Sequence, residues 1–474
     1  MPLPVISVAQ MREWERVTWA GGQTEQEVIR QAGHAVARRA EAMTKAGDFI
    51  VIFAGKGHNG DDAAVASEAI QNREVRLIRV FDPDLVATQL PGIMARKPAL
   101  IIDGLFGIGL NRPLAYNWIK LIQAINQSGR AILAVDVPSG LNADTGEPLD
   151  DAIRATVTLT LGAAKFGMLR PAAWPFVGRL EAASEIGLVP YPFETEIRMI
   201  LPEDFAGFPP PRPLASHKGT FGHLAIIAGS FGYHGAAVLS ARGAQRSQPG
   251  LITLFTDEVV YHPVAEQLQS VMVKTWQSDF VLPANCTGLL IGPGLAAPNI
   301  PEVVKEACRR LWQESPAAMV VDASALAWLP EGPCPEKAIR VITPHPGEAA
   351  RLLDFTSADI QEDRALALRQ LSKRWCNCYV VLKGHQTMMG RGREEIQVNC
   401  SGNPHLAQGG SGDLLAGYLA GLLAQPALQK DASQTIRYAV WEHGAAADAL
   451  QARRPNWTVE DLEEELGGVI APRA

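Results

Sequence analysis

A glycine-rich turn followed at once by a carboxylate lies near the end of this 474-residue chain, at Gly409-Gly-Ser-Gly-Asp413. The apolar run from Leu414 to Leu423 comes next and predicts a buried helix. Such a turn offers free backbone N–H groups and a helix N-terminus, which suit a phosphate or a developing oxyanion. Asp413 is then placed to take a proton from an attacking hydroxyl, as in kinases of small hydroxylated molecules. A plain tight turn with Asp413 as the helix N-cap is the structural alternative.

Two more polar clusters in the second half follow strand-like apolar runs. Lys383-Gly-His-Gln-Thr387 combines a lysine, a glycine and a hydroxyl, which can bind the ribose or phosphates of a nucleotide. Thr343-Pro-His-Pro-Gly-Glu348 holds His345 between two prolines, which favours a ligand-facing loop over a core histidine. The chain has no G-x-x-x-x-G-K-[ST] motif, which argues against a Walker-type ATPase.

The first half contains a comparable strand and turn, ending in Gly55-Lys-Gly-His-Asn-Gly60. Formally this is the G-x-G-x-x-G pattern of a dinucleotide-binding domain, and Asp82 follows the next strand where a ribose-binding acid belongs. Asp61 and Asp62, however, lie where a pyrophosphate would need N–H groups. A desolvated like-charge contact costs several kcal/mol. A bound cation would remove this conflict.

Two further aspartates head loops at predicted strand ends in the first half. Asp103 begins Asp-Gly-Leu-Phe-Gly-Ile-Gly-Leu-Asn-Arg-Pro113, and Asp136 begins Asp-Val-Pro-Ser-Gly-Leu-Asn142. Their oxygens suit a hard cation. Each Asp can equally serve as a turn former or an N-cap.

Both halves alternate strand-like and helix-like patterns, which predicts the α/β class with parallel sheets covered by helices. In such sheets function collects at the C-terminal ends of the strands, and all the clusters above follow apolar runs. Helices are expected over Met11 to Met43, broken at Gly21-Gly22, and over Leu414–Leu423. Strands are expected at Phe49–Ala54, Val75–Phe81, Ala99–Asp103, Ile132–Val135, Thr156–Leu161, His223–Ala228, Leu251–Phe255, Gly288–Gly292, Met319–Asp322, Arg340–Thr343 and Tyr379–Lys383.

A proline-rich stretch, Phe208-Pro-Pro-Pro-Arg-Pro213, marks a domain boundary because it lacks amide hydrogens and favours an extended, stiff chain. A chain of 474 residues also exceeds one ordinary core. We therefore expect a domain over residues 1–202, a linker over 203–213 and a second domain over 214–474.

The composition is that of an ordinary soluble globular protein, with 47% hydrophobic and 20% charged residues. The net charge of -7 gives no electrostatic case for a nucleic acid or an anionic membrane partner. Met1 to Arg12 has no apolar signal core, and the run Leu414 to Leu428 is too short to span a bilayer. The six cysteines fit neither a zinc nor a redox spacing, which indicates reduced cysteines in a cytoplasmic protein.

The motifs of the second half form an ordered series: His217-Lys-Gly, Gly229-Ser230, Gly292-Pro-Gly294, Asp322-Ala-Ser-Ala-Leu326, Thr343–Glu348, Lys383-Gly and Gly410–Asp413. This series resembles the NAD(P)H-hydrate dehydratase family, which has a ribokinase-like α/β/α fold, and it covers residues 214–474. The resemblance implies a nucleotide-dependent dehydration of hydrated NADH or NADPH. Bacterial-type members use ADP as co-substrate, and Mg2+ is the implied metal.

The resemblance also implies roles for individual residues. The hydrate would contact Ala236, Gly294, His345 and Asp413, and the nucleotide would contact Lys383, Gly384, His385, Gln386, Thr387 and Gly412. As the catalytic base, Asp413 would deprotonate the C6 hydroxyl, which attacks the terminal phosphorus so that phosphate can later leave. Ser324 stands where the family usually has a second Asp, and His405-Leu406 where it tends to have Gly-Met.

In the first half, Gln31-Ala-Gly33, the turn before Asp62 and the two aspartate loops resemble the NAD(P)H-hydrate epimerase domain. This domain has a Rossmann-like three-layer α/β/α fold, and the resemblance covers about residues 5 to 195. It implies K+ on Asn59, Asp103 and Ser139, and Asp136 as the acid/base that inverts C6. It also implies that the hydrate contacts His58, Asn59, Gly60, Asp61, Asp62, Gly107, Ile108, Gly109, Leu110, Asn111, Arg112 and Pro113.

Four positions depart from the usual epimerase motifs: His58, Asp61, Ala63 and Ile108. They leave open a working, an altered or a lost epimerase. Two alternatives remain beside the bifunctional repair enzyme. One is a ribokinase-like small-molecule kinase, and the other treats the N-terminal half as a non-catalytic nucleotide-binding or oligomerisation module. The family resemblance implies small-molecule substrates (NADHX, NADPHX and ADP), no nucleic acid or membrane partner, and a homo-oligomer.

Overall fold

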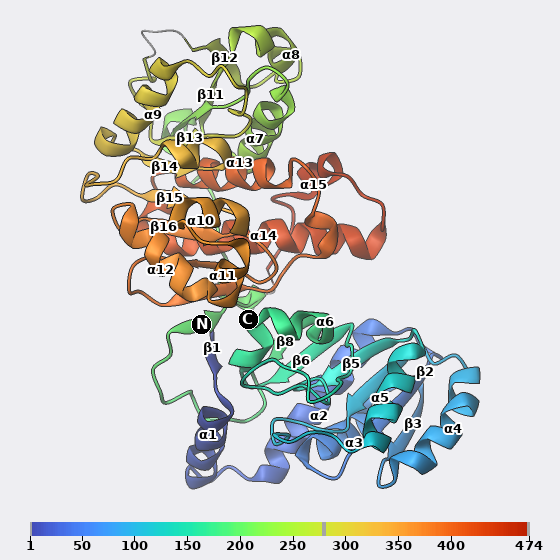
Figure 1. Cartoon of the computed structure of the whole chain (residues 1–474). Coiled ribbons are helices and arrows are strands. Elements are labelled where there is room, and N and C mark those ends of the chain that lie inside the picture. Colours follow the sequence, from blue (N-terminus) through green and yellow to red (C-terminus); the bar gives the residue numbers. More distant parts are fainter. Residues whose placement is uncertain (1, 277–280, 472–474) are drawn as a thin grey trace. The chain divides into compact units, whose positions relative to one another are not determined.

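The computed structural model describes residues 2–276 and 281–471, which form two compact units (Figure 1). The N-terminal unit spans Leu3–Met199, and the C-terminal unit begins at Ile200. The division lies before the proline-rich stretch because Phe205 is already buried in the core of the C-terminal unit, against Tyr438 and Trp441.

The N-terminal unit is built on a parallel sheet with the strand order β3-β2-β4-β5-β6-β8. Three short strands lie outside it, with β1 parallel to β7 and antiparallel to β9. The strands are β1 (Leu3–Ile6), β2 (Phe49–Ala54), β3 (Glu74–Arg79), β4 (Leu100–Gly104), β5 (Ala131–Val135), β6 (Val157–Leu161), β7 (Ala164–Lys165), β8 (Arg179–Ala183) and β9 (Ile197–Met199). The helices are α1 (Val8–Ala20), α2 (Glu25–Met43), α3 (His58–Ala69), α4 (Pro83–Ala95), α5 (Tyr116–Gln127) and α6 (Trp174–Val177).

Strand β2 shows why helices cover both faces of this sheet. All six of its residues are buried, and alternate side chains of a strand point to opposite faces. Ile50 and Ile52 join a core with α2 and α3, whereas Val51 and Phe53 join a core with α4 and α5. The result is three layers, with the loops after β2, β4 and β5 at one edge of the sheet.

Helices α2 and α3 approach each other very closely at Gly33. A Cβ atom at this position would lie 2.5 Å from the Val65 side chain and 2.8 Å from the Asp62 carbonyl oxygen. Glycine is therefore required for this packing. The close approach buries the start of α3 beneath α2.

The C-terminal unit is built on a sheet with the order β12-β11-β10-β13-β14-β15-β16-β17-β18. The pairs are parallel through β16, and β17 and β18 run antiparallel. The strands are β10 (His223–Ile227), β11 (Leu251–Thr256), β12 (Met272–Thr275), β13 (Gly288–Ile291), β14 (Ala318–Val321), β15 (Arg340–Ile342), β16 (Tyr379–Leu382), β17 (Thr387–Gly390) and β18 (Ile396–Asn399). The helices are α7 (His234–Arg246), α8 (Tyr261–Ala265), α9 (Glu302–Glu314), α10 (Pro346–Leu353), α11 (Ser357–Glu362), α12 (Arg364–Arg374), α13 (Ser411–Leu423), α14 (Ala432–Arg453) and α15 (Val459–Glu465).

Helix α13 is the buried helix that the apolar run predicts. It packs against α7 and α14, and its Gly417 allows α7 to approach because a Cβ there would lie 1.9 Å from the Ser240 carbonyl oxygen. Gly410 is the N-cap, with a left-handed φ of 96°. Asp413 is therefore in the first turn of α13 and is not its N-cap.

The predicted strands correspond to β2 to β6 in the first half and to β10, β11 and β13 to β16 in the second, with ends shifted by one or two residues. The sequence did not reveal the short or edge strands β1, β7, β8, β9, β12, β17 and β18. Within residues 2–276 and 281–471, no helix is long and apolar enough to cross a membrane.

The expectation of six reduced cysteines is wrong for one pair. Cys334 and Cys376 form a disulfide across 42 residues, with their Cα atoms 6.0 Å apart. Cys286, Cys308, Cys378 and Cys400 are not part of a disulfide. Sequence spacing could not show the pair because tertiary folding brings the two loops together.

Candidate active sites

A buried lysine–carboxylate pair lies where β14, β15 and β16 of the C-terminal unit end. Lys383 Nζ is 2.6 Å from Asp322 Oδ1, and the Thr343 hydroxyl donates to the same oxygen at 2.7 Å. Burial alone would lower the pKa of Lys383, but the carboxylates of Asp322, Glu348 and Asp413 raise it. The lysine is therefore a fixed positive charge at the edge of the sheet. Motif reasoning assigned Lys383 to the nucleotide and gave Asp322 no role.

Asp413 lies beside this pair. A Cβ atom on the preceding Gly412 would be 3.5 Å from Lys383 Nζ, which places the glycine turn at the ammonium group. Burial raises the pKa of Asp413 to about 7, helped by Asp322 and Glu348 and opposed by Lys383. A carboxylate with this pKa can accept a proton at neutral pH.

His443 of α14 contacts the backbone of the glycine turn. Its Nε2 lies 3.2 Å from the Ser411 carbonyl oxygen, and burial lowers its pKa to about 4, so the ring is neutral. A neutral ring with a protonated Nε2 donates a hydrogen bond to this carbonyl. The sequence analysis missed His443 because nothing distinguishes it from a core histidine in an apolar helix.

The loops after β10 and β13 meet at Gly294, with a φ of 66°. A Cβ atom there would lie 2.9 Å from the Ala236 Cβ and 2.6 Å from the Tyr233 carbonyl oxygen. The Ser230 hydroxyl donates to the Gly294 carbonyl at 2.6 Å. The structure thus brings together Ala236 and Gly294, two of the residues predicted to contact the hydrate.

His345 serves as the N-cap of α10. Its Nδ1 accepts a hydrogen bond from the Gly347 N–H at 3.0 Å, and Glu348 Oε2 accepts from the His345 N–H at 2.8 Å. The side chain is 52% exposed, so the rest of the ring remains accessible to a ligand.

Arg364 of α12 forms hydrogen bonds with the backbone around the predicted nucleotide loop, residues 383–387. This arginine is 3% exposed and donates to the Leu382 carbonyl at 3.0 Å and to the His385 carbonyl. The Thr387 hydroxyl donates to the Gly384 carbonyl at 2.9 Å, which closes the turn. Arg364 was not found from the sequence because nothing near it marks a loop 20 residues away.

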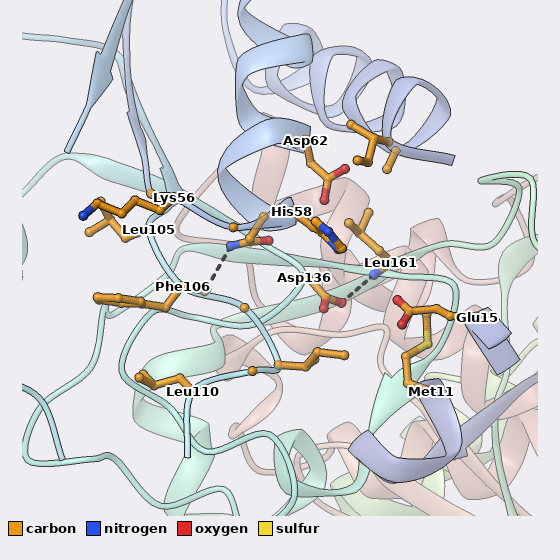
Figure 2. A pocket seen from close by; sticks show the side chains of 18 of the residues that line it. Met11, Glu15, Lys56, His58, Asp62, Leu105, Phe106, Leu110, Asp136 and Leu161 are labelled. Carbon is orange, nitrogen blue, oxygen red and sulfur yellow. Dashed lines mark hydrogen bonds between the residues drawn. The ribbon is translucent and has the colours of Figure 1, made fainter. Parts of the chain in front are cut away.

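A cavity of about 860 Å³ opens at the strand ends of the N-terminal unit (Figure 2). It is large enough for a nucleotide-sized molecule. Its walls come from α1, α2, the start of α3 and the loops after β2, β4 and β5. Of the predicted hydrate contacts, the lining contains His58, Asn59, Gly107, Ile108, Gly109, Leu110, Asn111 and Arg112, together with Asp62 and Asp136.

The remaining predicted contacts lie outside the lining. Gly60 packs on the backbone, since a Cβ there would lie 2.2 Å from the Gly55 carbonyl oxygen, and Asp61 pairs with Arg79 at 3.0 Å. Two of the departing residues have structural partners as well. His58 Nε2 lies 2.7 Å from Glu25 of α2, and Ile108 packs against the small apolar cluster around Trp14.

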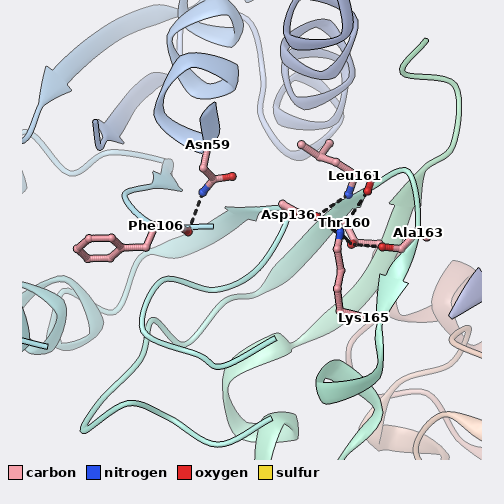
Figure 3. A network of polar contacts seen from close by, with 7 residues as sticks. All are labelled: Asn59, Phe106, Asp136, Thr160, Leu161, Ala163 and Lys165. Carbon is pink, nitrogen blue, oxygen red and sulfur yellow. Dashed lines mark hydrogen bonds and ion pairs between the residues drawn. The ribbon is translucent and has the colours of Figure 1, made fainter. Parts of the chain in front are cut away.

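The three residues predicted to bind K+ meet at the end of β4. Asp103 accepts hydrogen bonds from the Ser139 N–H at 2.8 Å and from the Ser139 hydroxyl at 2.7 Å. Asn59 donates from Nδ2 to the Phe106 carbonyl at 2.8 Å (Figure 3). Its Oδ1 is buried without a hydrogen-bond partner. These neighbouring amide, carboxylate, hydroxyl and carbonyl oxygens are the donors that a hard cation prefers, and the unpartnered oxygen fits such an ion.

Asp136 forms a buried ion pair that the sequence did not reveal. Lys165 of β7 is fully buried, and its Nζ lies 2.5 Å from Asp136 Oδ1. The same oxygen accepts from the Leu161 N–H at 2.9 Å and from the Thr160 hydroxyl at 3.1 Å (Figure 3). Such contacts stabilise the ionised carboxylate. Asp136 itself has a left-handed φ of 61° and lines the cavity.

Within the part of the chain that the structure describes, no cluster of three or more His, Cys, Asp or Glu could hold a metal ion. The predicted K+ set is of a different kind, because it contains one carboxylate and otherwise neutral oxygens.

Two family models match the chain, one for each unit. A model described as NAD(P)H-hydrate dehydratase matches residues 224–467, and one described as YjeF-related protein N-terminus matches residues 82–167. The Gloeobacter violaceus bifunctional NAD(P)H-hydrate repair enzyme Nnr is 34% identical, over 95% of this chain and 94% of its own. The enzyme of the same name from Vibrio cholerae is 36% identical, over 74% and 70%.

Among solved structures, a ribokinase-like superfamily protein from Enterococcus faecalis is 26% identical, with a TM-score of 0.51. The match covers 58% of this chain and 96% of that one. The C-terminal unit is therefore a ribokinase-like domain. The chain belongs to the family of bifunctional NAD(P)H-hydrate repair enzymes.

Proposed function

We propose that this protein returns hydrated NADH and NADPH to the active cofactors. The C-terminal unit dehydrates the S hydrate at the expense of ADP, giving AMP and phosphate, and the N-terminal unit interconverts the R and S hydrates. The observation that carries the dehydratase proposal is Asp413, a carboxyl with a pKa of about 7 on a glycine turn beside the Lys383 ammonium. The family membership supports both activities.

The geometry gives each group of the dehydratase a task. Asp413 takes the proton from the C6 hydroxyl, whose oxygen then attacks the terminal phosphorus of ADP. The N–H groups of Gly409–Gly412 and the Lys383 ammonium stabilise negative charge on the phosphoryl oxygens. The ring nitrogen then expels phosphate, and loss of the C5 proton restores the dihydropyridine. Phosphate leaves readily where hydroxide does not.

The nucleotide would bind along residues 383–387 and Gly412, with Arg364 fixing the loop. The Glu348 carboxylate lies close enough to Asp413 to influence it, and it offers oxygen ligands of the kind that Mg2+ takes together with phosphate oxygens. Bound Mg2+ would neutralise phosphate charge. Ala236, Gly294 and His345 form the surfaces assigned to the hydrate.

In the N-terminal unit, the cavity would receive the nicotinamide end of the hydrate, with K+ held by Asn59, Asp103 and Ser139. Asp136, to which the resemblance gives the acid/base role, lines the cavity and so lies where a group acting on the ring of the hydrate must lie. The departures at His58, Asp61 and Ile108 all have partners in the fold, and Ala63 is fully buried in the core. We therefore propose an active epimerase.

The remaining expectations belong to this proposal: small-molecule substrates alone, the cytoplasm as the place of action, and a homo-oligomeric assembly.

The test is repair of a mixed R and S NADPH-hydrate preparation by the full-length protein with ADP, Mg2+ and K+. Recovery of the dihydronicotinamide absorbance from the whole mixture, faster than spontaneous epimerisation, is the expected result. Recovery of the S fraction alone would retain the dehydratase and reject the epimerase. A stable phosphorylated product without recovered cofactor would identify a small-molecule kinase instead.

A further inference from the structure

The N-terminal cavity contains a second carboxyl whose surroundings differ from those of Asp136. Asp62 lies near the start of α3 and lines the cavity, and its side chain points toward the same space as Asp136 (Figure 2). The residue is only 6% exposed because α2 packs tightly over it at Gly33. Asp62 is therefore buried against protein on one side and open to the cavity on the other.

The two aspartates have opposite electrostatic environments. Asp136 is paired with the Lys165 ammonium and with two hydrogen-bond donors. The charged groups that act on Asp62 are instead carboxyls: Asp136, Asp61 and Glu15. Burial, followed by these three acids, raises the pKa of Asp62 well above its ordinary value. A buried carboxyl surrounded by other carboxyls, in the same cavity as a carboxylate paired with an ammonium group, is an arrangement in which one acid can donate a proton and the other can act as an anion.

Inversion at C6 of the hydrate needs both kinds of group. The C6–O bond breaks as the ring nitrogen forms a double bond to C6, which produces a cationic iminium ring. The departing hydroxyl must receive a proton to leave as water. Water must then add to the opposite face of C6 and lose a proton.

We propose that Asp62 is the proton donor and acceptor of C6 epimerisation, while the Lys165-paired Asp136 carboxylate stabilises the cationic ring. This inference rests on the proposed epimerase function. The Asp62 O–H proton passes to the leaving hydroxyl, giving water, the iminium cation and the Asp62 carboxylate. Water adds to the other face and releases one proton to solvent, and the Asp62 carboxylate takes up one proton from solvent. The electron pair that leaves with oxygen is replaced by the pair of the incoming water, so the cycle consumes nothing.

Other charged groups face the same cavity and influence the pH range over which Asp62 can donate its proton. They are Arg12 and Glu15 from α1, Glu25 from α2, Lys56 and His58 around the glycine turn, Arg112, and the Asp136–Lys165 pair. Glu15 is also partly buried, and burial together with Asp136 raises its pKa. Since the acid form of Asp62 starts the reaction, the rate falls as pH rises through the pKa of Asp62.

The experiment starts from a single purified hydrate epimer and follows the appearance of the other by chromatography, without nucleotide. Asp62→Asn, which keeps size but cannot exchange the proton, is expected to lower kcat by about 100-fold or more with little change in KM. Glu68→Gln, an exposed acid-to-amide change on the same helix, is the matched control and is expected to stay within about twofold of wild type. The thermal unfolding of each variant reports the folding of the N-terminal unit, and its dehydratase activity on the S hydrate reports the C-terminal unit.

A second measurement needs no variant. The pH–rate profile of the wild-type protein should fall on its alkaline side with a slope of one proton, and a flat profile would overturn the proposal. Asp62→Asn activity within about threefold of wild type would do the same while leaving the epimerase function in place. A wild-type protein that does not interconvert the epimers would instead reject the epimerase function itself.

Discussion

The two units of this molecule contain closely similar sets of charges, and comparing them shows how one arrangement serves opposite proton transfers. In each unit a lysine locks one aspartate: Lys383 with Asp322 at 2.6 Å, and Lys165 with Asp136 at 2.5 Å. In each, a second aspartate follows a glycine-rich turn at the start of a helix.

The difference lies in what the second aspartate can reach. Asp413 is close enough to Lys383 for the ammonium to offset part of the effect of burial, and its pKa is about 7. Asp62 is acted on by carboxyls, and burial together with these carboxyls raises its pKa well above the ordinary range. A poised carboxylate can act as a base on a hydroxyl, and a protonated carboxyl can act as an acid. The position of the lysine relative to the second aspartate therefore decides whether that aspartate acts as a base or as an acid.

The largest expected effect is that of Asp413→Asn. Removing the base should lower kcat for ADP-dependent dehydration by about 100-fold to 10,000-fold, with epimerisation unchanged. Steady-state kinetics on the S hydrate and epimer chromatography measure the two activities separately. Glu314→Gln, an exposed acid at the end of α9, is the matched control. Parallel loss of both activities in Asp413→Asn would mean that the two sites are not independent.

Lys165→Met tests the buried ion pair between Lys165 and Asp136. An uncompensated buried charge should destabilise the N-terminal unit by about 3–5 kcal/mol. Spectroscopically monitored unfolding of the N-terminal unit in denaturant measures the change in its free energy of unfolding. Lys165→Met with Asp136→Asn removes both charges and should recover part of the loss. Equal destabilisation of the single and double variants would show that packing, not charge, is the main contribution of Lys165.

The pH dependence of dehydration sharpens the contrast between base and acid. Asp413 must be ionised to act, so kcat should rise by about tenfold per pH unit below pH 7 and level off above it, since its pKa is about 7. The rate of epimerisation should instead fall as the pH rises. The two profiles, measured on the same preparation, would contradict this account if both rose with pH.

Asn59→Ala removes the unpartnered Oδ1 from the candidate K+ site. For the wild-type protein, K+ should raise the melting temperature relative to Na+ at equal ionic strength, since an ion bound only by the folded state stabilises it. The variant should lose most of that difference. Gln71→Ala, in the exposed turn after α3, provides a control. An identical K+ effect in the Asn59 variant would place the ion elsewhere.

The smallest expected effect is that of His443→Phe. The variant loses the hydrogen bond to the Ser411 carbonyl, which typically contributes about 0.5–1.5 kcal/mol, and should lower dehydratase kcat several-fold through a looser turn. Since His443 is neutral, its pKa being about 4, the alkaline plateau of the pH profile should keep its position. A shift of the profile along the pH axis would mean that His443 changes the pKa of Asp413.

Sequence reasoning identified the strands that end in functional loops because long apolar runs bounded by glycine and aspartate carry their own local signal. The runs at β2, β10 and β13 to β16 are examples. Strands β7, β17 and β18 have no such signal, because two to four residues of mixed polarity become strands only when a neighbouring strand pairs with them. Lys165 was missed for this reason, since it lies on β7.

Motifs located the candidate residues but not the partners that set their chemistry. The sequence alone places Asp413, Asp136 and Asn59 at the boundaries of predicted strands and helices. Arg364 behind the nucleotide loop and His443 beneath the glycine turn come from helices distant in the sequence. No spacing rule connects a residue to a loop that only the folded chain brings within 3 Å.

The sequence alone determined the fold class, the two-part organisation and the position of each reactive carboxyl, because hydrophobic periodicity and glycine-rich turns act over a few neighbouring residues. The tertiary structure decided which charged groups surround each carboxyl. Protonation depends on burial and on charges within a few ångströms, and here those charges come from separate strands and helices. Lys165 beside Asp136, Lys383 near Asp413, and carboxyls around Asp62 are outcomes of packing.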